Sequence, residues 1–285
     1  VAVALLALHL DRQCDGTKIR AIAAKSAPLS STRPLLFLSF ASGFLMLAAE
    51  VIFQHQFAQF FVSSYHSSAM VLSLVLVSLS AGAVLTPWVA KLGSRAMTWA
   101  LAASALAFAA QPLVLVVQRG GLVYLPFKRE FAEYFWNALK LGIPACSLLL
   151  IPGALIFPMV LKEAIARSAN VGRILAINGL GGWFGAELAE RFIAPAYGLW
   201  WSMSLVAAGY GLSVLLQQGT LRWWLGSALC IIIPFSWRIN QRLPFAGLAD
   251  GEKLVAVSVG REGVVGVVRG EPDDWRIIFN NNYTL

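Results

Sequence analysis

Long apolar stretches, separated by short polar segments, fill most of the chain up to Trp237. Most are about as long as the roughly 20 apolar residues that an α-helix needs to cross a bilayer. The pattern therefore predicts an all-α polytopic membrane helix bundle of about six to seven spans over residues 34–237. The predicted spans are Leu35–Phe57, Ser67–Val89, Met97–Val117, Leu141–Leu161, Ile174–Ile193, Leu199–Leu216 and Leu221–Trp237.

Two segments outside these spans have patterns of their own. Residues 1–33 begin with the apolar run Val1–Leu10, which we interpret as the end of a preceding segment, and continue as a basic linker. Within Gln118–Lys140, apolar and aromatic residues recur at helical spacing among charged ones. That pattern predicts an amphipathic helix lying in the membrane interface.

The pattern changes at Arg238, where the chain becomes polar with short β-type runs. Leu254–Val259 is one such run, and Gly263–Val268 and Trp275–Phe279 form a predicted hairpin around a turn that contains proline, aspartate and glycine. One hairpin with two open edges cannot bury a core of its own. We therefore expect residues 238–285 to be the β-rich start of a soluble α/β domain that is truncated in this chain.

The composition agrees with a membrane protein. Mean hydropathy is +0.71 and 13% of the residues are charged, whereas soluble domains have about 25%. The net charge of +8 would suggest nucleic-acid binding in a soluble protein. Here the lysines and arginines lie mainly in short connections between apolar runs, as in membrane proteins. We therefore expect the lipid bilayer, and not nucleic acid, as the partner; the oligomeric state is left open.

The basic connections also predict an orientation in a plasma (inner) membrane. Asp11–Arg33 is rich in lysine and arginine and is assigned to the cytoplasm, whereas Val62–Ser68 has neither residue and should face outward. Lys91 and Arg95 mark a second inner connection. Arg238 and the basic residues after it predict a cytoplasmic C-terminal tail, which requires one of the last three apolar segments to be re-entrant or interfacial.

Glu50 is the most informative residue of the first predicted span, because a carboxylate inside a membrane helix is costly and rarely faces lipid. With Gly43 and Gln54 it falls on one helical face, and His55 extends the polar stretch. One interpretation is an intramembrane site for a proton or cation made by Glu50, Gln54 and His55. The other is that Glu50 pairs with water or with a neighbouring helix.

The segment 178–191 is rich in glycine and charge. Gly181 and Gly185 form a small-xxx-small pair that predicts close helix packing. Glu187 and Arg191 are spaced for an ion pair within one helix. A phosphate-binding loop would need a strand before the glycines, and none is predicted.

No catalytic, cofactor-binding or metal-binding residues are predicted. Cys14, Cys146 and Cys230 lack metal-ligand spacing, and His9 and His66 are isolated. Tryptophans fall mostly near predicted span ends, as in an aromatic belt; they are Trp88, Trp99, Trp136, Trp200, Trp201, Trp223, Trp224 and Trp237.

Several segments, taken in order, resemble one family. The tail Arg261–Leu285 is similar to the start of the spermidine synthase (polyamine aminopropyltransferase) domain of membrane-fused family members. Leu35–Phe53 resembles the first helix of that family, with small residues and glycine before an acidic residue. Ser147–Ala164 and Gly172–Ser202 resemble later helices.

This resemblance implies a membrane region followed by a Rossmann-like transferase domain that binds decarboxylated S-adenosylmethionine and a polyamine acceptor. The family residues for that chemistry have no counterpart in this chain, so we expect it to be inactive alone. At Val265-Gly266 soluble members usually have a Tyr-Gln pair, and this departure bears on the substrate. The expected function is thus to anchor a synthase-like domain and to move its substrate or product. The alternatives are a small-molecule (amine or cation) transporter, or half of one, and a purely structural anchor.

Overall fold

The computed structural model describes residues 33–60, 64–118, 131–217, 220–240, 248, 251–260, 263–270, 274–280 and 282–284. The apolar run Val1–Leu10 and nearly all of the basic linker Asp11–Arg33 lie outside the described residues. So do most of the first half of Gln118–Lys140 and part of the outer connection Val62–Ser68.

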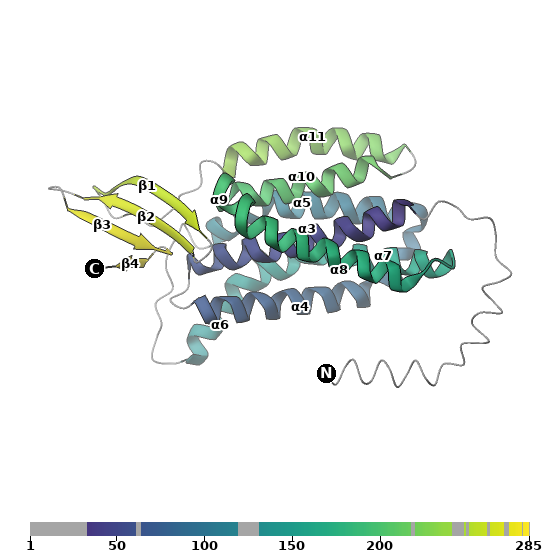
Figure 1. Cartoon of the computed structure of the whole chain (residues 1–285), viewed down its shortest axis with the longest axis horizontal. Coiled ribbons are helices and arrows are strands. Elements are labelled where there is room, and N and C mark those ends of the chain that lie inside the picture. Colours follow the sequence, from purple (N-terminus) through teal and green to yellow (C-terminus); the bar gives the residue numbers. More distant parts are fainter. Residues whose placement is uncertain are drawn as a thin grey trace.

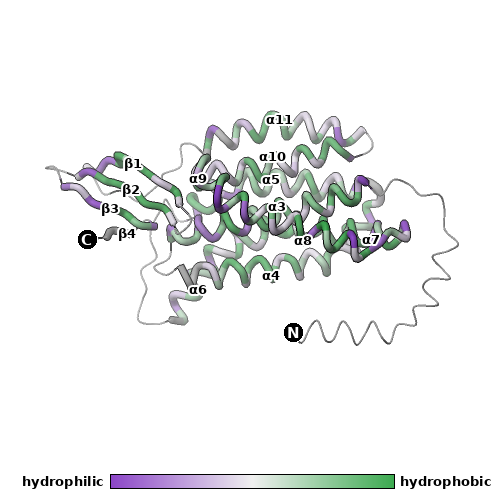
Figure 2. The backbone as a smooth tube through the Cα atoms, in the orientation of Figure 1, coloured by the Kyte–Doolittle hydropathy of each residue, from purple (hydrophilic) through white to green (hydrophobic). Residues whose placement is uncertain are grey.

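The described helices run along one another in a single bundle (Figure 1). They are α3 (Arg33–Ala58), α4 (Ser64–Val89), the short η1 (Ala90–Arg95), α5 (Ala96–Gln118), α6 (Phe131–Gly142), η2 (Ile143–Ser147), α7 (Leu148–Ala166), α8 (Val171–Leu188), η3 (Ala189–Ile193), α9 (Ala194–Tyr197), α10 (Trp201–Leu215) and α11 (Leu221–Asn240). The residues of these helices are mostly apolar, as the colouring of the backbone tube shows (Figure 2).

Among the described residues, four helical stretches are long and apolar enough to cross a membrane: Arg33–Ala58, Ser68–Gly93, Ala96–Gln118 and Ala132–Ala166. Trp201–Leu215 and Leu221–Ser236 are shorter apolar helices. The structure thus confirms a mainly helical chain with an apolar bundle. It does not establish the predicted six to seven spans, because α8, α10 and α11 are too short or not apolar enough by the same measure.

Helix α3 occupies the centre of the bundle and contacts α4, α7, α8 and α10. Its residues Ile52, Phe53 and Phe57 are fully buried. Next to them, the rings of Phe108 on α5 and Tyr210 on α10 stack with centroids 5.2 Å apart. A helix that is apolar on all sides is expected to be largely buried, and the C-terminal half of α3 meets that expectation except along the side of Leu47, Glu50 and Gln54.

The predicted interfacial helix and the predicted fourth span form one continuous helical stretch. Helix α6 is amphipathic and leads through η2, a π-helical segment that contains Pro144, into α7. The helix therefore does not end near Leu141, where a boundary between two helices was expected. Proline removes one backbone hydrogen bond from a helix, and a π-helical turn accommodates this without ending the helix.

The C-terminal segment forms a four-stranded antiparallel sheet with strands in sequence order. Its strands are β1 (Lys253–Gly260), β2 (Gly263–Arg269), β3 (Trp275–Phe279) and β4 (Asn282–Thr284). The predicted hairpin is confirmed, since Val265 pairs with Phe279 and Arg269 with Trp275. The sheet is larger than the single hairpin expected, because β1 and β4 pair along its two sides.

The sheet is docked on one end of the bundle (Figure 1). Val259 at the end of β1 and Val264 at the start of β2 belong to the same apolar core as Phe57 and Phe60 of the bundle. Strand β1 also contacts α9, and β2 contacts α3. Helix α11 continues to Asn240, and the sheet contributes Val259 and Val264 to the core of the helices, whereas Val268 and Ile278 form a small cluster of their own.

The two ends of the bundle differ in what they carry. Helix α3 begins at Arg33 on the end away from the sheet, where η1 and the turn between α7 and α8 also lie (Figure 1). If the bundle crosses a bilayer, its two ends face opposite sides. The predictions of a cytoplasmic basic linker before α3 and a cytoplasmic C-terminal tail are therefore incompatible with this arrangement.

Candidate functional site

The three polar residues predicted from α3 are all half-buried. Gln54 lies on the face of Glu50, one turn later, and His55 follows it. Helix α3 contacts η3, which carries Glu190, and Phe57 of α3 lies near Gly142, the residue before η2.

Both of these neighbours are π-helical segments. The segment η2 joins α6 to α7, and η3 joins α8 to α9. Such segments are rare in proteins and are frequent at functional sites, because they displace side chains from the regular helical register. Their position beside the C-terminal half of α3 makes the stretch from Glu50 to His55 the strongest candidate region for chemistry within the bundle.

Gly181 and Gly185 lie where α8 packs against α3. A methyl group on Gly181 would overlap the carbonyl oxygen of Phe40, and one on Gly185 would overlap that of Phe44. On the other helix, a methyl group on Gly43 would overlap the carbonyl oxygen of Asn178. The backbones therefore approach as closely as small-xxx-small packing allows.

Two hydrogen bonds reinforce this crossing from opposite directions. The Ser39 hydroxyl donates to the carbonyl oxygen of Ile174 at 2.7 Å, and the Asn178 side-chain amide donates to the carbonyl oxygen of Ser39 at 2.9 Å. The predicted ion pair within the same segment is also present, with Arg191 Nε 2.7 Å from Glu187 Oε2. The α3–α8 pair is thus a structural unit with no room for a ligand at the crossing.

A polar junction joins the sheet to α3, and sequence reasoning missed it. Asn280, 8% exposed, adopts the left-handed conformation with φ 45°. Its Oδ1 accepts hydrogen bonds from the Val264 backbone N–H at 2.9 Å and from Gln59 Nε2 at 3.2 Å. Its own N–H donates to the Val264 carbonyl oxygen at 2.8 Å. Asn280 therefore connects the end of β3 with the start of β2 and with the turn that follows the central helix.

A second glutamine fastens another part of the same end. Gln56 is fully buried and donates from Nε2 to the carbonyl oxygen of Leu199, just before α10, at 3.2 Å. The only sequence signal for these roles was a polar residue in an otherwise apolar helical stretch. Such a residue predicts a buried hydrogen bond, but it does not identify the partner.

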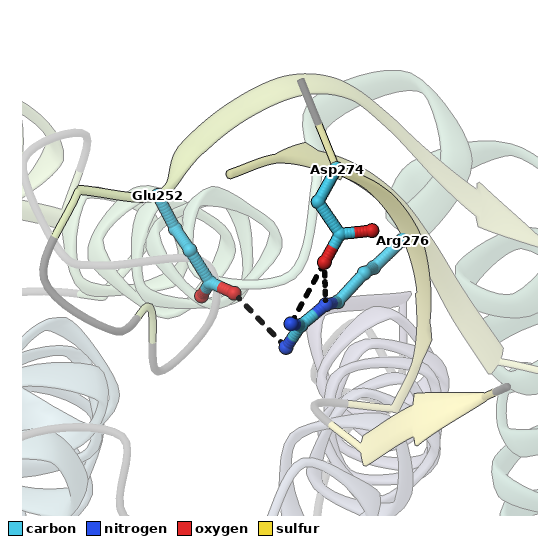
Figure 3. Close-up of polar contacts among 3 residues, drawn as sticks. All are labelled: Glu252, Asp274 and Arg276. Carbon is cyan, nitrogen blue, oxygen red and sulfur yellow. Dashed lines mark hydrogen bonds and ion pairs between the residues drawn. The ribbon is translucent and has the colours of Figure 1, made fainter. Parts of the chain in front are cut away.

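Ion pairs connect the strands at the end of the sheet that is far from the bundle (Figure 3). Arg276 Nε and Nη2 both lie 2.8 Å from Asp274 Oδ2, and Nη1 lies 3.6 Å from Glu252 Oε1. The Arg269 guanidinium lies over the Trp275 ring, 5.5 Å from its centroid. These contacts tie the beginnings of β1 and β3 together, which is a structural role.

The sheet has apolar residues on both faces. Val268 and Ile278 are buried on one face. On the other, Val265, Trp275, Ile277 and Phe279 are exposed, with Trp275 and Ile277 each 54% exposed. An antiparallel sheet with one solvated face normally carries polar residues on that face. The outer face therefore has the composition of a surface that further protein covers.

The interior of the bundle offers little space for a ligand. A shallow hollow among α3, α5, α7 and α10, lined by Ser42, Leu101, Ile156, Tyr210 and Ser213 with other α3 residues, has no enclosed space for a water-sized molecule. Small-molecule sites usually measure about 300–1,000 Å³. In the part of the chain that the structure describes, no three His, Cys, Asp or Glu side chains are grouped as metal ligands would be.

Comparison with protein-family models, curated proteins and solved structures gave no match.

Proposed function

We propose that this chain is a membrane-embedded helical module that holds a β-sheet domain firmly at one face of the bilayer. The observation that carries the proposal is the junction between sheet and bundle. Val259 and Val264 are part of the bundle's apolar core, and Asn280 is hydrogen-bonded to Gln59, the residue that follows the central helix. A sheet on a flexible linker would need neither contact.

We further propose that the sheet is the opening of a spermidine synthase-like domain. The sequence resemblance of Arg261–Leu285 and of the preceding helices supports this identification. The exposed apolar residues on the outer face of the sheet support a larger domain that packs against it. Binding of decarboxylated S-adenosylmethionine and of a polyamine belongs to that larger domain, and we assign neither to residues of this chain.

Two measurements on the native gene product test the two parts separately. Resistance of the protein to extraction by alkaline carbonate tests membrane embedding. Transfer of the aminopropyl group from labelled decarboxylated S-adenosylmethionine to a diamine tests the synthase part. A folded protein that stays in the membrane but transfers no aminopropyl group would support the anchor function and contradict the proposed transferase activity.

A transporter of amines or cations is the second candidate function, favoured by the half-buried Glu50 and His55 in the otherwise apolar helix α3. The test is uptake of labelled polyamine into proteoliposomes by the Glu50→Gln variant, with Glu133→Gln on α6 as the matched control. Loss of uptake in the first variant alone would support transport. Equal uptake and equal folding in both would favour the anchor.

The orientation belongs to the same proposal. Positive-inside counting places the end with Lys91, Arg95 and Arg173 in the cytoplasm, and the sheet then lies on the other side. A synthase-like domain that uses a cytoplasmic cofactor requires the opposite orientation, as predicted for the tail from Arg238. The side on which the sheet lies is therefore a direct test of the family resemblance.

A further inference from the structure

Positive charge gathers on the end of the bundle away from the sheet, called here the basic end. Its seven cations come from five helical elements and the turn after α7, and no single segment of the sequence contains them all. They are Arg33, Lys91, Arg95, Lys162, Arg167, Arg173 and Arg222. All are exposed except Arg222, which is half-buried. Figure 2 shows hydrophilic colour at this end on helices whose middle parts are apolar.

Acidic residues do not balance these cations within the described part of the chain. Glu163 is the one described carboxylate at this end, and it binds Arg167 at 2.7 Å. No described acidic side chain forms an ion pair with Lys91, Arg95 or Arg173. Exposed cations that the protein itself does not neutralise are available to an external anion.

Tryptophans mark the level at which this end meets a membrane interface. Trp88 lies in the last turn of α4 and Trp99 in the first turn of α5. Trp223 and Trp224 lie in the first turn of α11. Their exposed fractions range from 47% to 78%. Tryptophan is enriched at the headgroup level of bilayers. Lys91 follows Trp88 by three residues, about one helical turn, so the cations stand at or just beyond the headgroups.

We propose that the basic end binds the headgroups of anionic phospholipids. The inference rests on the proposed membrane embedding and adds the chemistry of the lipid partner. Arginine and lysine are the residues that bind lipid phosphates, and the tryptophan level places them at the depth of those phosphates. The sheet end also has described cations, among them Lys140, Arg191 and Arg238, but there they are accompanied by acidic residues such as Glu187, which pairs with Arg191, and Glu190.

Native mass spectrometry of the detergent-purified chain tests this by titration with phosphatidylglycerol and with phosphatidylcholine of the same acyl chains. The variant is Lys91→Gln with Arg95→Gln, and the matched control is Lys140→Gln with Arg238→Gln at the sheet end. We expect the first pair to weaken phosphatidylglycerol binding roughly tenfold at low salt. Phosphatidylcholine binding should not change, and the control pair should have a clearly smaller effect.

Exchanging the two cations for each other, Lys91→Arg with Arg95→Lys, keeps the charge and should restore binding, which separates lost charge from lost folding. Phosphatidylglycerol binding that is weakened equally by the Lys91→Gln/Arg95→Gln and Lys140→Gln/Arg238→Gln variants, or by neither of them, would overturn the proposed site. Retention of neither lipid by the unmodified chain would contradict membrane embedding itself, which is the proposed function and not this inference.

Discussion

Replacing Asn280 should loosen the sheet from the bundle while leaving the helices folded. The side chain satisfies two buried donors, the Val264 backbone N–H and Gln59 Nε2. Leaving a buried donor without an acceptor costs about 1–3 kcal/mol. Because the bond to Gln59 is long at 3.2 Å, we expect Asn280→Gly to destabilise the docked sheet by about 2–4 kcal/mol.

Two companion variants separate the contribution of the Asn280 side chain to stability from that of its backbone conformation. Asn280→Asp keeps an acceptor oxygen for both donors and should lose clearly less than Asn280→Gly. Asn280→Ala loses the acceptor and in addition places a Cβ in the left-handed conformation at φ 45°. That conformation costs about 1 kcal/mol for a residue other than glycine or asparagine. We therefore expect stability to fall in the order wild type, Asp, Gly, Ala.

Hydrogen exchange of backbone amides, followed in nanodiscs, measures this effect locally. Exchange of the Val259 and Val264 amides should accelerate in the Gly variant by the factor that corresponds to the lost free energy, about 30-fold for 2 kcal/mol. Amides in the middle of α3 serve as the internal control and should not change. Unchanged protection of Val264 in Asn280→Gly, or equal losses in the Asp and Gly variants, would refute the role given to the side-chain oxygen.

Three further predictions concern the helices and the membrane. Gly185→Leu should prevent the close approach of α8 to α3 and abolish the thermal transition of the purified bundle. At Gly179 an added Cβ meets no atom within 4 Å, so Gly179→Leu should unfold near the wild-type temperature. Ser39→Ala removes the 2.7 Å bond to the carbonyl oxygen of Ile174 and should lower stability by about 0.6–2 kcal/mol in the same scan; no change would mean that the bond contributes nothing. In a background without native cysteines, Ala166→Cys and Ser258→Cys should react with a membrane-impermeant maleimide from opposite sides of the membrane; labelling of both from one side would contradict a membrane-crossing bundle.

The helices could be predicted from the sequence because burial in lipid and burial in protein select the same apolar residues. The first three predicted spans end within a few residues of α3, α4 and α5. One boundary failed where proline interrupts an apolar helix. At Pro144 the chain continues through a π-helical turn, and hydropathy alone cannot distinguish this from a helix end.

The candidate site was harder to predict because it depends on contacts between distant segments. Glu50 and His55 were recognisable as costly residues in an apolar helix, but α3 packs against segments far away in the sequence, such as η3 with Glu190. Asn280 gave no signal, since asparagine after a strand usually predicts only a turn. Its importance comes from the 221 residues that separate it from Gln59, a pairing that only the folded chain defines.

The docked sheet gives the membrane topology a functional consequence. Because Val259, Val264 and Asn280 fix the sheet to the bundle, the sheet cannot move to the other side of the bilayer independently of the helices. Its side is decided by the direction in which α3 crosses, and the charges around η1 favour an α3 that starts in the cytoplasm. The resemblance to a synthase that uses a cytoplasmic cofactor favours the reverse direction. Labelling of Ser258→Cys therefore bears on the enzyme as directly as on the topology: a cytoplasmic sheet supports a tethered transferase, and an external sheet requires a different partner for its exposed apolar face.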